Sequence, residues 1–236
     1  MSAADREAQP QRQWPARAVL IDLDGTLLDT IDDLAAAANA MLIELGQASL
    51  PLEQLRSFVG KGAEELVRRS LTGSMHGVVE PSRLEQGVAI FRAHYDLENG
   101  RRARCYPGVR EGLAAMRERG LALACVTNKP VAFTLPLLER TALMDWFDVV
   151  VGGDSLPQKK PHPAQLLHAC EGLDVPASQA IMIGDSVNDT LAARAAGMPV
   201  FVVPYGYNEG IAVETLQADA LVPSLEYANR LIEIIR

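Results

Sequence analysis

The stretch AVLIDLDGT, residues 18–26, decides the fold. Its first four residues form a short continuous apolar run, which is typical of a strand that is buried on both faces of a parallel sheet. Two carboxylates, a glycine and a hydroxyl follow this run directly. We therefore predict a central strand over residues 18–21 that leads into a functional loop over residues 22–26.

The same pattern recurs along the chain. Apolar runs that end in polar residues or glycine predict strands at residues 121–126, 147–151, 181–183 and 200–203, and more weakly at 220–222. Helical patterns lie between these runs, at residues 109–119, 163–170 and 187–196. This alternation predicts an α/β fold with a Rossmann-like parallel sheet as its core. Ligands of such folds bind beyond the carboxyl ends of the strands, where the polar clusters of this chain lie.

One long segment interrupts the alternation. Between residue 31 and about residue 100, apolar residues at helical spacing replace the strand pattern. They predict four helices, at residues 31–45, 52–58, 63–71 and 83–97. We expect an inserted helical-bundle cap domain that lies over the carboxyl edge of the sheet. The predicted organisation is a flexible tail at residues 1–15, an α/β core at 16–29 and 103–236, and a helical cap at 30–102.

Composition excludes several classes of function. The chain has 236 residues and a formal net charge of −8 at pH 7, which argues against nucleic acids and anionic membranes as partners. No apolar stretch reaches the roughly 18 residues that a membrane-spanning helix needs. The three cysteines show no CxxC spacing, so we expect a reduced protein of the cytoplasm. We also expect a monomer or a homodimer.

Two acidic clusters carry the candidate chemistry. Asp22 and Asp24 follow the first predicted strand, and Asp185 and Asp189 follow the strand predicted at residues 181–183. Four carboxylates at one sheet edge repel each other unless a cation lies between them, and oxygen ligands suit Mg²⁺. A structural alternative stays open here, because Asp, Ser and Asn are also favoured caps at the start of a helix.

Two further polar residues belong to the same edge. Thr127 follows the strand predicted at residues 121–126, so its hydroxyl is expected to face the crevice. Lys160 stands before a Pro-His-Pro sequence, and the proline restrains the backbone from which the lysine side chain leaves. The alternative for Lys160 is an ordinary solvated surface lysine.

In this order, Asp-x-Asp-Gly-Thr, Thr127, Lys160 and Gly-Asp-x₃-Asp, the chain resembles the haloacid dehalogenase-like hydrolase superfamily over nearly its whole length. Within that superfamily, the resemblance is strongest to the bacterial phosphatases that hydrolyse 2-phosphoglycolate. The segments that carry it are IDLDGTLLDT (21–30), FVGKGAEEL (58–66), YPGV (106–109), GGDSLPQKKPHP (152–163) and YGYN (205–208).

The resemblance implies a Mg²⁺-dependent phosphomonoester hydrolase that forms an aspartyl-phosphate intermediate. It implies that Asp22 is the nucleophile and that Asp24 is the general acid and base. It also implies that Mg²⁺ is held by Asp22, by the backbone carbonyl of Asp24 and by Asp185, with Asp189 completing the shell. The expected reaction is the hydrolysis of 2-phosphoglycolate to glycolate and phosphate.

For the substrate, a small phosphorylated organic acid, the resemblance implies that Thr127, Asn128 and Lys160 bind the phosphoryl oxygens. Lys61, which lies between Gly60 and Gly62, is a possible contact to a substrate carboxylate. An exposed lysine in a helix–helix turn is the alternative for this residue.

Three other functions compete. A β-phosphoglucomutase-like enzyme and a sugar-phosphate phosphatase belong to the same superfamily and keep both acids of the Asp-x-Asp motif. A receiver domain of two-component signalling also combines acidic residues, a phosphorylated Asp, a Thr and a Lys. In a receiver domain, the acidic pair comes first in the chain and precedes the phosphorylated Asp. Here the Asp-x-Asp motif comes first and the second acidic cluster comes last. A helical insertion of about 70 residues is also foreign to receiver domains.

Overall fold

The computed structural model describes residues 12–235, and its centre is a parallel sheet with the strand order β6-β5-β2-β7-β8-β9. The strands are β2 (Ala18–Ile21), β5 (Ala122–Val126), β6 (Val149–Val151), β7 (Ala180–Gly184), β8 (Val200–Val202) and β9 (Ala220–Leu221). Each of them lies where an apolar run predicts it. The predicted α/β fold with a Rossmann-like sheet is therefore confirmed.

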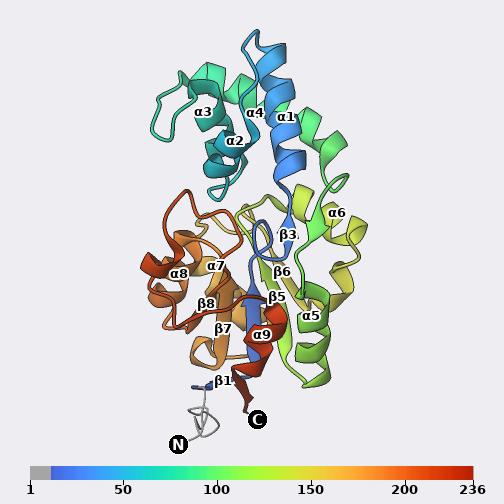
Figure 1. Cartoon of the computed structure of the whole chain (residues 1–236), viewed down its shortest axis with the longest axis vertical. Coiled ribbons are helices and arrows are strands. Elements are labelled where there is room, and N and C mark those ends of the chain that lie inside the picture. Colours follow the sequence, from blue (N-terminus) through green and yellow to red (C-terminus); the bar gives the residue numbers. More distant parts are fainter. Residues whose placement is uncertain (1–11, 236) are drawn as a thin grey trace, which may run out of the picture.

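Helices cover both faces of this sheet because successive side chains of a buried strand point to opposite faces. Val19 and Ile21 of β2 belong to one buried cluster, and Ala18 and Leu20 belong to the other. The first cluster includes α5 (Val109–Glu118), α6 (Val131–Arg140) and α9 (Leu225–Arg230). The second includes α7 (Ala164–Gly172) and α8 (Val187–Ala195), which lie together on one side of the sheet in Figure 1.

A second, two-stranded sheet shows that the boundary predicted between the tail and the core, at residue 16, was wrong. β1 (Trp14–Ala16) pairs in parallel with β10 (Ile232–Ile234), so ordered structure begins before residue 16. The Trp14 ring packs edge-on against Phe201 at a centroid distance of 5.0 Å, which buries it at the end of the core. The rest of the predicted tail, residues 1–11, lies outside the described residues.

The inserted segment forms a separate helical unit. Its helices are α1 (Ile31–Glu44), α2 (Leu52–Phe58), α3 (Ala63–Thr72) and α4 (Pro81–Glu98). Their apolar faces share one buried cluster, to which α1 contributes the helically spaced Leu34, Ala38 and Met41. Figure 1 shows the unit above the carboxyl ends of the strands. Within residues 12–235, no helix is long and apolar enough to cross a membrane.

Two short strands connect the helical unit to the sheet. β3 (Leu28–Asp29) leaves the sheet and pairs antiparallel with β4 (Arg104–Cys105), which returns to it. Asp33, at the start of α1, is fully buried and accepts hydrogen bonds from the backbone N–H groups of Gly100 (2.9 Å), Arg102 (2.9 Å) and Ala103 (3.1 Å). This carboxylate ties the outgoing connection to the returning one.

Replacing Asp33 with Ala is expected to destabilise the protein. The change leaves three backbone N–H groups without their acceptor, at a cost of about 2–3 kcal/mol in the free energy of unfolding. Chemical denaturation measures this difference. Asp32→Ala is the matched control, because Asp32 is exposed in the same helical turn and shares any favourable effect of a negative charge near the helix N-terminus. Equal midpoints for the two variants would contradict the role of Asp33.

The described residues also include three short 3₁₀ helices, η1 (Met144–Trp146), η2 (Ala177–Gln179) and η3 (Val213–Thr215).

Candidate active site

The candidate site lies where three neighbouring strands end below the helical unit. Asp22 and Asp24 follow β2, Thr127 follows β5, and Asp185 follows β7. Because β2 pairs with both β5 and β7, these residues meet at one edge, as their places in the sequence predict.

Three carboxylates form a buried acidic cluster. Oxygen atoms of Asp22, Asp185 and Asp189 all lie within 4.8 Å of one another. Burial raises the pKa of Asp22 to about 7, although the nearby Lys160 opposes the rise. Burial and the charges of Asp22 and Asp189 also raise the pKa of Asp185 well above its usual range. A divalent cation would relieve this repulsion, and three carboxylates are a donor set that fits a hard cation such as Mg²⁺.

Lys160 is the cation of this cluster. Its Nζ lies 2.6 Å from Asp189 Oδ1 and 2.9 Å from Asp22 Oδ1, and it donates a hydrogen bond to the carbonyl of Val126 at 2.8 Å. Burial alone would lower the pKa of this ammonium, but the two carboxylates outweigh that effect and hold the pKa above its ordinary value. Lys160 is buried, which excludes a solvated surface lysine.

Asp189 satisfies both interpretations of its sequence position. One carboxylate oxygen binds Lys160, and the other accepts hydrogen bonds from the backbone N–H (3.1 Å) and the hydroxyl (2.7 Å) of Ser186. Ser186 and Asp189 therefore form a capping box at the start of α8. The helix cap thus fixes a carboxylate of the site.

Asp185 is held by the loops that follow β2 and β8. Thr26 donates its hydroxyl to Asp185 Oδ1 at 3.0 Å, and the backbone N–H of Tyr207 donates to Oδ2. Gly25 has a φ of +89°, and a Cβ atom there would lie only 2.3 Å from Asp185 Oδ2. Glycine is required at this position because of both its backbone conformation and this close approach.

The side chain of Asp24 points to different partners. Its two oxygens lie 2.9 and 3.0 Å from Lys129 Nζ, and Oδ1 also accepts the Thr30 hydroxyl at 2.6 Å. Sequence reasoning did not single out Lys129, which is almost completely buried. The available signal was its position directly after Thr127 and Asn128, at the end of a buried strand.

Of the other predicted substrate contacts, Thr127 and Asn128 line the cavity described below, and Lys61 does not. Thr127 is buried and lines the cavity described below. Asn128 lines it too, but its side-chain N–H₂ group donates to the carbonyls of Lys160 (2.9 Å) and Gly60 (3.2 Å). Lys61 does not line this cavity, and its Nζ lies 3.5 Å from the Glu209 carboxylate instead. A direct contact between Lys61 and the substrate is therefore not supported.

The sheet edge and the helical unit enclose a small cavity. The volume open to the centres of water-sized spheres is about 50 Å³, and one water molecule needs roughly 10–15 Å³ by that measure. The sheet side contributes Asp22, Asp24, Thr127, Lys129 and Lys160 to the lining. The helical unit contributes the mostly apolar Leu34, Val59, Leu66, Phe91 and Tyr95. The cavity is therefore charged on one side and apolar on the other.

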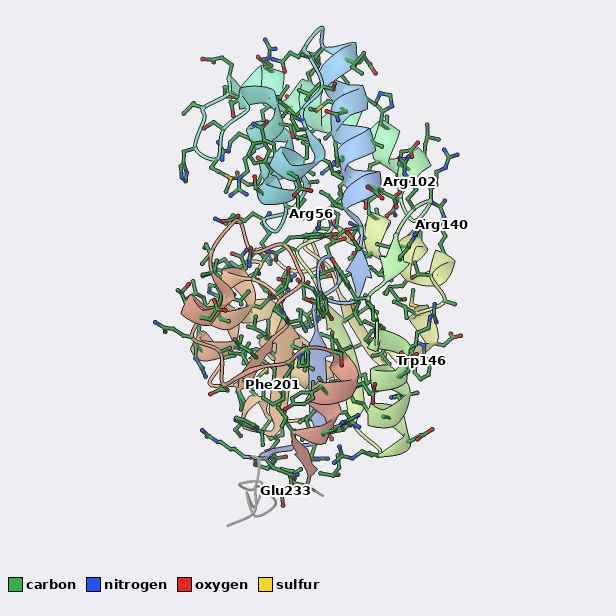
Figure 2. The ribbon with its side chains drawn as sticks, in the orientation of Figure 1. Arg56, Arg102, Arg140, Trp146, Phe201 and Glu233 are labelled. Carbon is green, nitrogen blue, oxygen red and sulfur yellow. The ribbon has the colours of Figure 1, made fainter. Side chains whose placement is uncertain are left out.

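The loop after β8 joins the two sides. The Tyr207 hydroxyl accepts hydrogen bonds from the backbone N–H groups of Thr30 (2.7 Å) and Ile31 (3.0 Å) at the start of α1. Glu209 pairs with the buried Arg69 of α3 at 2.8 Å. Arg56 of α2, at the border between the helical unit and the sheet in Figure 2, lies over the Tyr207 ring with its guanidinium carbon 5.4 Å from the centroid. These contacts were not evident from the sequence.

The fold and this edge of acidic residues define a class of protein. The family of haloacid dehalogenase-like hydrolases matches residues 19–203, and the chain belongs to this family. A phosphoglycolate phosphatase of Nitrosospira multiformis is 56% identical over 219 residues, which are 93% of this chain and 96% of the relative. A plasmid-encoded phosphoglycolate phosphatase of Cupriavidus necator is 50% identical over 213 residues, 90% of this chain and 91% of the relative.

The structural comparison agrees with these relatives. The crystal structure of a predicted phosphoglycolate phosphatase from Haemophilus somnus superimposes with a TM-score of 0.85 at 29% sequence identity. The match covers 91% of this chain and 97% of that one. Together, the family and the relatives indicate that this chain is a phosphoric monoester hydrolase.

Proposed function

We propose that the protein hydrolyses 2-phosphoglycolate to glycolate and phosphate, and that the reaction requires Mg²⁺. The observation that carries this proposal is the cavity, which is small and is lined by two buried lysines, Lys129 and Lys160. A substrate with two anionic groups and only two carbon atoms matches that lining. The names of the curated relatives support the same substrate.

Asp22 is the proposed nucleophile. Its carboxylate oxygen attacks phosphorus, the bond from phosphorus to the glycolate oxygen breaks, and Asp24 gives a proton to the departing oxygen. Asp24 then takes a proton from a water molecule, whose oxygen attacks the phosphoryl group on Asp22. The bond from phosphorus to Asp22 breaks, phosphate leaves, and both carboxyl groups return to their starting states.

The other site residues position and neutralise the phosphoryl group. Lys160, the Thr127 hydroxyl and the backbone N–H of Asn128 are proposed to bind its oxygens. Asp22, the backbone carbonyl of Asp24 and Asp185 would hold Mg²⁺, with Asp189 completing the shell. When bound, this ion supplies positive charge to the phosphoryl oxygens, and phosphoryl transfer depends mainly on such positioning and charge stabilisation.

The helical unit is proposed to act as a cap. We assign residues 30–102 to this cap and residues 14–29 and 103–235 to the α/β core. The carbonyl of Gly60, between α2 and α3, accepts hydrogen bonds from Asn128 (3.2 Å) and Asn188 (3.3 Å) on the core side. These bonds hold the cap over the site, where it keeps bulk water away from the reaction.

A panel of phosphate esters tests the proposal. With Mg²⁺ present, released phosphate is measured for 2-phosphoglycolate, ethyl phosphate, glucose 6-phosphate, β-glucose 1-phosphate and p-nitrophenyl phosphate. We expect kcat/KM for 2-phosphoglycolate to exceed that for either hexose phosphate by about 100-fold or more, because a closed site distinguishes substrates by the groups it can pair.

The same panel separates the competing functions. Conversion of β-glucose 1-phosphate to glucose 6-phosphate without phosphate release would identify a mutase. A hexose phosphate as the best substrate would identify a sugar-phosphate phosphatase. Phosphorylation without steady turnover would identify a receiver-type domain. Each of these results would overturn the proposed function.

A further inference from the structure

We infer that Lys129 recognises the carboxylate of the substrate, and that binding of the substrate there releases Asp24 for catalysis. This inference rests on the proposed hydrolysis of 2-phosphoglycolate and names the residue that selects this substrate.

Lys129 is a buried ammonium beside the reacting groups. Its Nζ contacts both carboxylate oxygens of Asp24, at 2.9 and 3.0 Å, and lies 4.9 Å from the centroid of the Tyr95 ring. Burial acts to lower the pKa of Lys129, but Asp24 and Tyr95 raise it by more, so its pKa lies above the usual value. The lysine therefore stays charged inside the cavity.

The other basic side chains discussed above already pair with carboxylates of the protein. Among the described residues that line the cavity, Lys129 and Lys160 are the only lysines or arginines. Lys160 lies between Asp22 and Asp189, at the expected position of the phosphoryl group. Lys61 and Arg69 pair with Glu209. A second anionic group on the substrate can therefore find its counter-charge in this cavity only at Lys129.

A second, independent observation points to a ligand at the same place. Tyr95 also lines the cavity, and its buried hydroxyl has no acceptor among the described residues, because the Lys129 ammonium beside it can only donate. A buried hydroxyl without an acceptor costs free energy, so such groups are rare in folded proteins. A carboxylate on Lys129 would supply an acceptor for this hydroxyl, because the ammonium lies over the ring of the same tyrosine.

The contact between Lys129 and Asp24 keeps Asp24 from acting as an acid or a base until a substrate carboxylate takes its place on Lys129. Both Asp24 oxygens bind Lys129, and Oδ1 also binds the Thr30 hydroxyl, so Asp24 is held away from a leaving oxygen. A substrate carboxylate replaces one ion pair with another of the same charge, and the released Asp24 takes up from water the proton that it then gives to the leaving oxygen. An ester without a carboxylate leaves Asp24 where it is, and its hydrolysis stays slow.

The test compares 2-phosphoglycolate with ethyl phosphate, which has the same carbon chain and no carboxylate. We expect the wild-type protein to prefer 2-phosphoglycolate by about 100-fold in kcat/KM, which is typical for loss of one partner of a buried charge pair. In Lys129→Met, this preference falls to about 3-fold or less, because the added carboxylate has lost its partner. Lys159→Met is the matched control, because Lys159 is an exposed lysine next to Lys160 in the sequence. We expect this variant to keep the wild-type preference.

The outcomes separate the two proposals. If the wild-type protein does not prefer 2-phosphoglycolate, the proposed function fails. If it does, and Lys129→Met keeps the full preference, only the inference about Lys129 fails. A circular dichroism spectrum and an unfolding midpoint close to those of the wild-type protein report whether the variant is folded. Should Lys129→Met not fold, Tyr95→Phe decides the matter, with an expected fall in preference of about 10-fold and an unchanged preference as the contrary result.

Discussion

Asn in place of Asp22 is expected to lower kcat for phosphate release by about 10⁴-fold or more, because loss of a catalytic nucleophile removes the covalent route altogether. An amide oxygen has nearly the shape of a carboxylate oxygen but does not attack phosphorus at a useful rate. Single-turnover assays with 2-phosphoglycolate measure the effect, and the phosphorylated protein should be absent from quenched samples.

The fold of the Asp22→Asn variant should survive. Lys160 keeps Asp189 at 2.6 Å and the Val126 carbonyl at 2.8 Å, so the ammonium is not left without partners. The change also removes a negative charge from a buried acidic cluster, which favours the folded state in metal-free buffer. Asp32→Asn, on an exposed carboxylate of α1, is the control for the loss of one charge. Turnover of the Asp22 variant near that of this control would refute the nucleophile assignment.

Removal of divalent cations is expected to stop turnover completely, and added Mg²⁺ should restore it. The physical reason is the acidic cluster, because three buried carboxylates within 4.8 Å of one another repel an incoming phosphoryl group until a cation neutralises them. Dialysis against EDTA followed by titration with Mg²⁺ measures the effect. Full activity after exhaustive chelation would exclude a metal requirement.

Asp185→Asn separates metal binding from the other effects of chelation. The variant is expected to need about 100-fold more Mg²⁺ for half-maximal activity, because one charged ligand is lost. A binding readout independent of turnover is the rise in Tm that Mg²⁺ causes by binding the folded state. This rise should be present in the wild-type protein and in the control Asp145→Asn, which changes an exposed residue, and should shrink in Asp185→Asn.

The sheet was readable from the sequence because its strands are buried on both faces. A run such as Ala18–Ile21 has no polar residue and ends abruptly at Asp22, so its position and its role are both evident. Helix α6 was not predicted, and the reason is Pro136 in its interior, which lacks an N–H group and disfavours a helix. The packing of Leu137 and Leu138 against the sheet outweighs this local cost.

The candidate site was readable only in part. Residues that follow buried strands, such as Asp22, Thr127 and Asp185, could be placed at one edge from topology alone. Lys129 and Glu209 could not, because their burial depends on partners 105 and 140 positions away, Asp24 and Arg69. Sequence patterns report the periodicity of one segment, whereas such pairs form only when two segments fold together.

β3 and β4 bring the two ends of the helical unit to a single point, where Leu28 is opposite Cys105 and Asp29 is opposite Arg104. Segments whose ends lie close together can be inserted into or exchanged between proteins with little disturbance. We therefore expect the proposed cap, residues 30–102, to be exchangeable as one unit. Lys129 and Lys160 remain with the sheet, so a chimaera carrying the cap of a relative would keep both cations and acquire new apolar walls. Under the proposed function, the core would supply the two cations that select charge, and the helical unit would supply the Tyr95 hydroxyl and the walls that select shape.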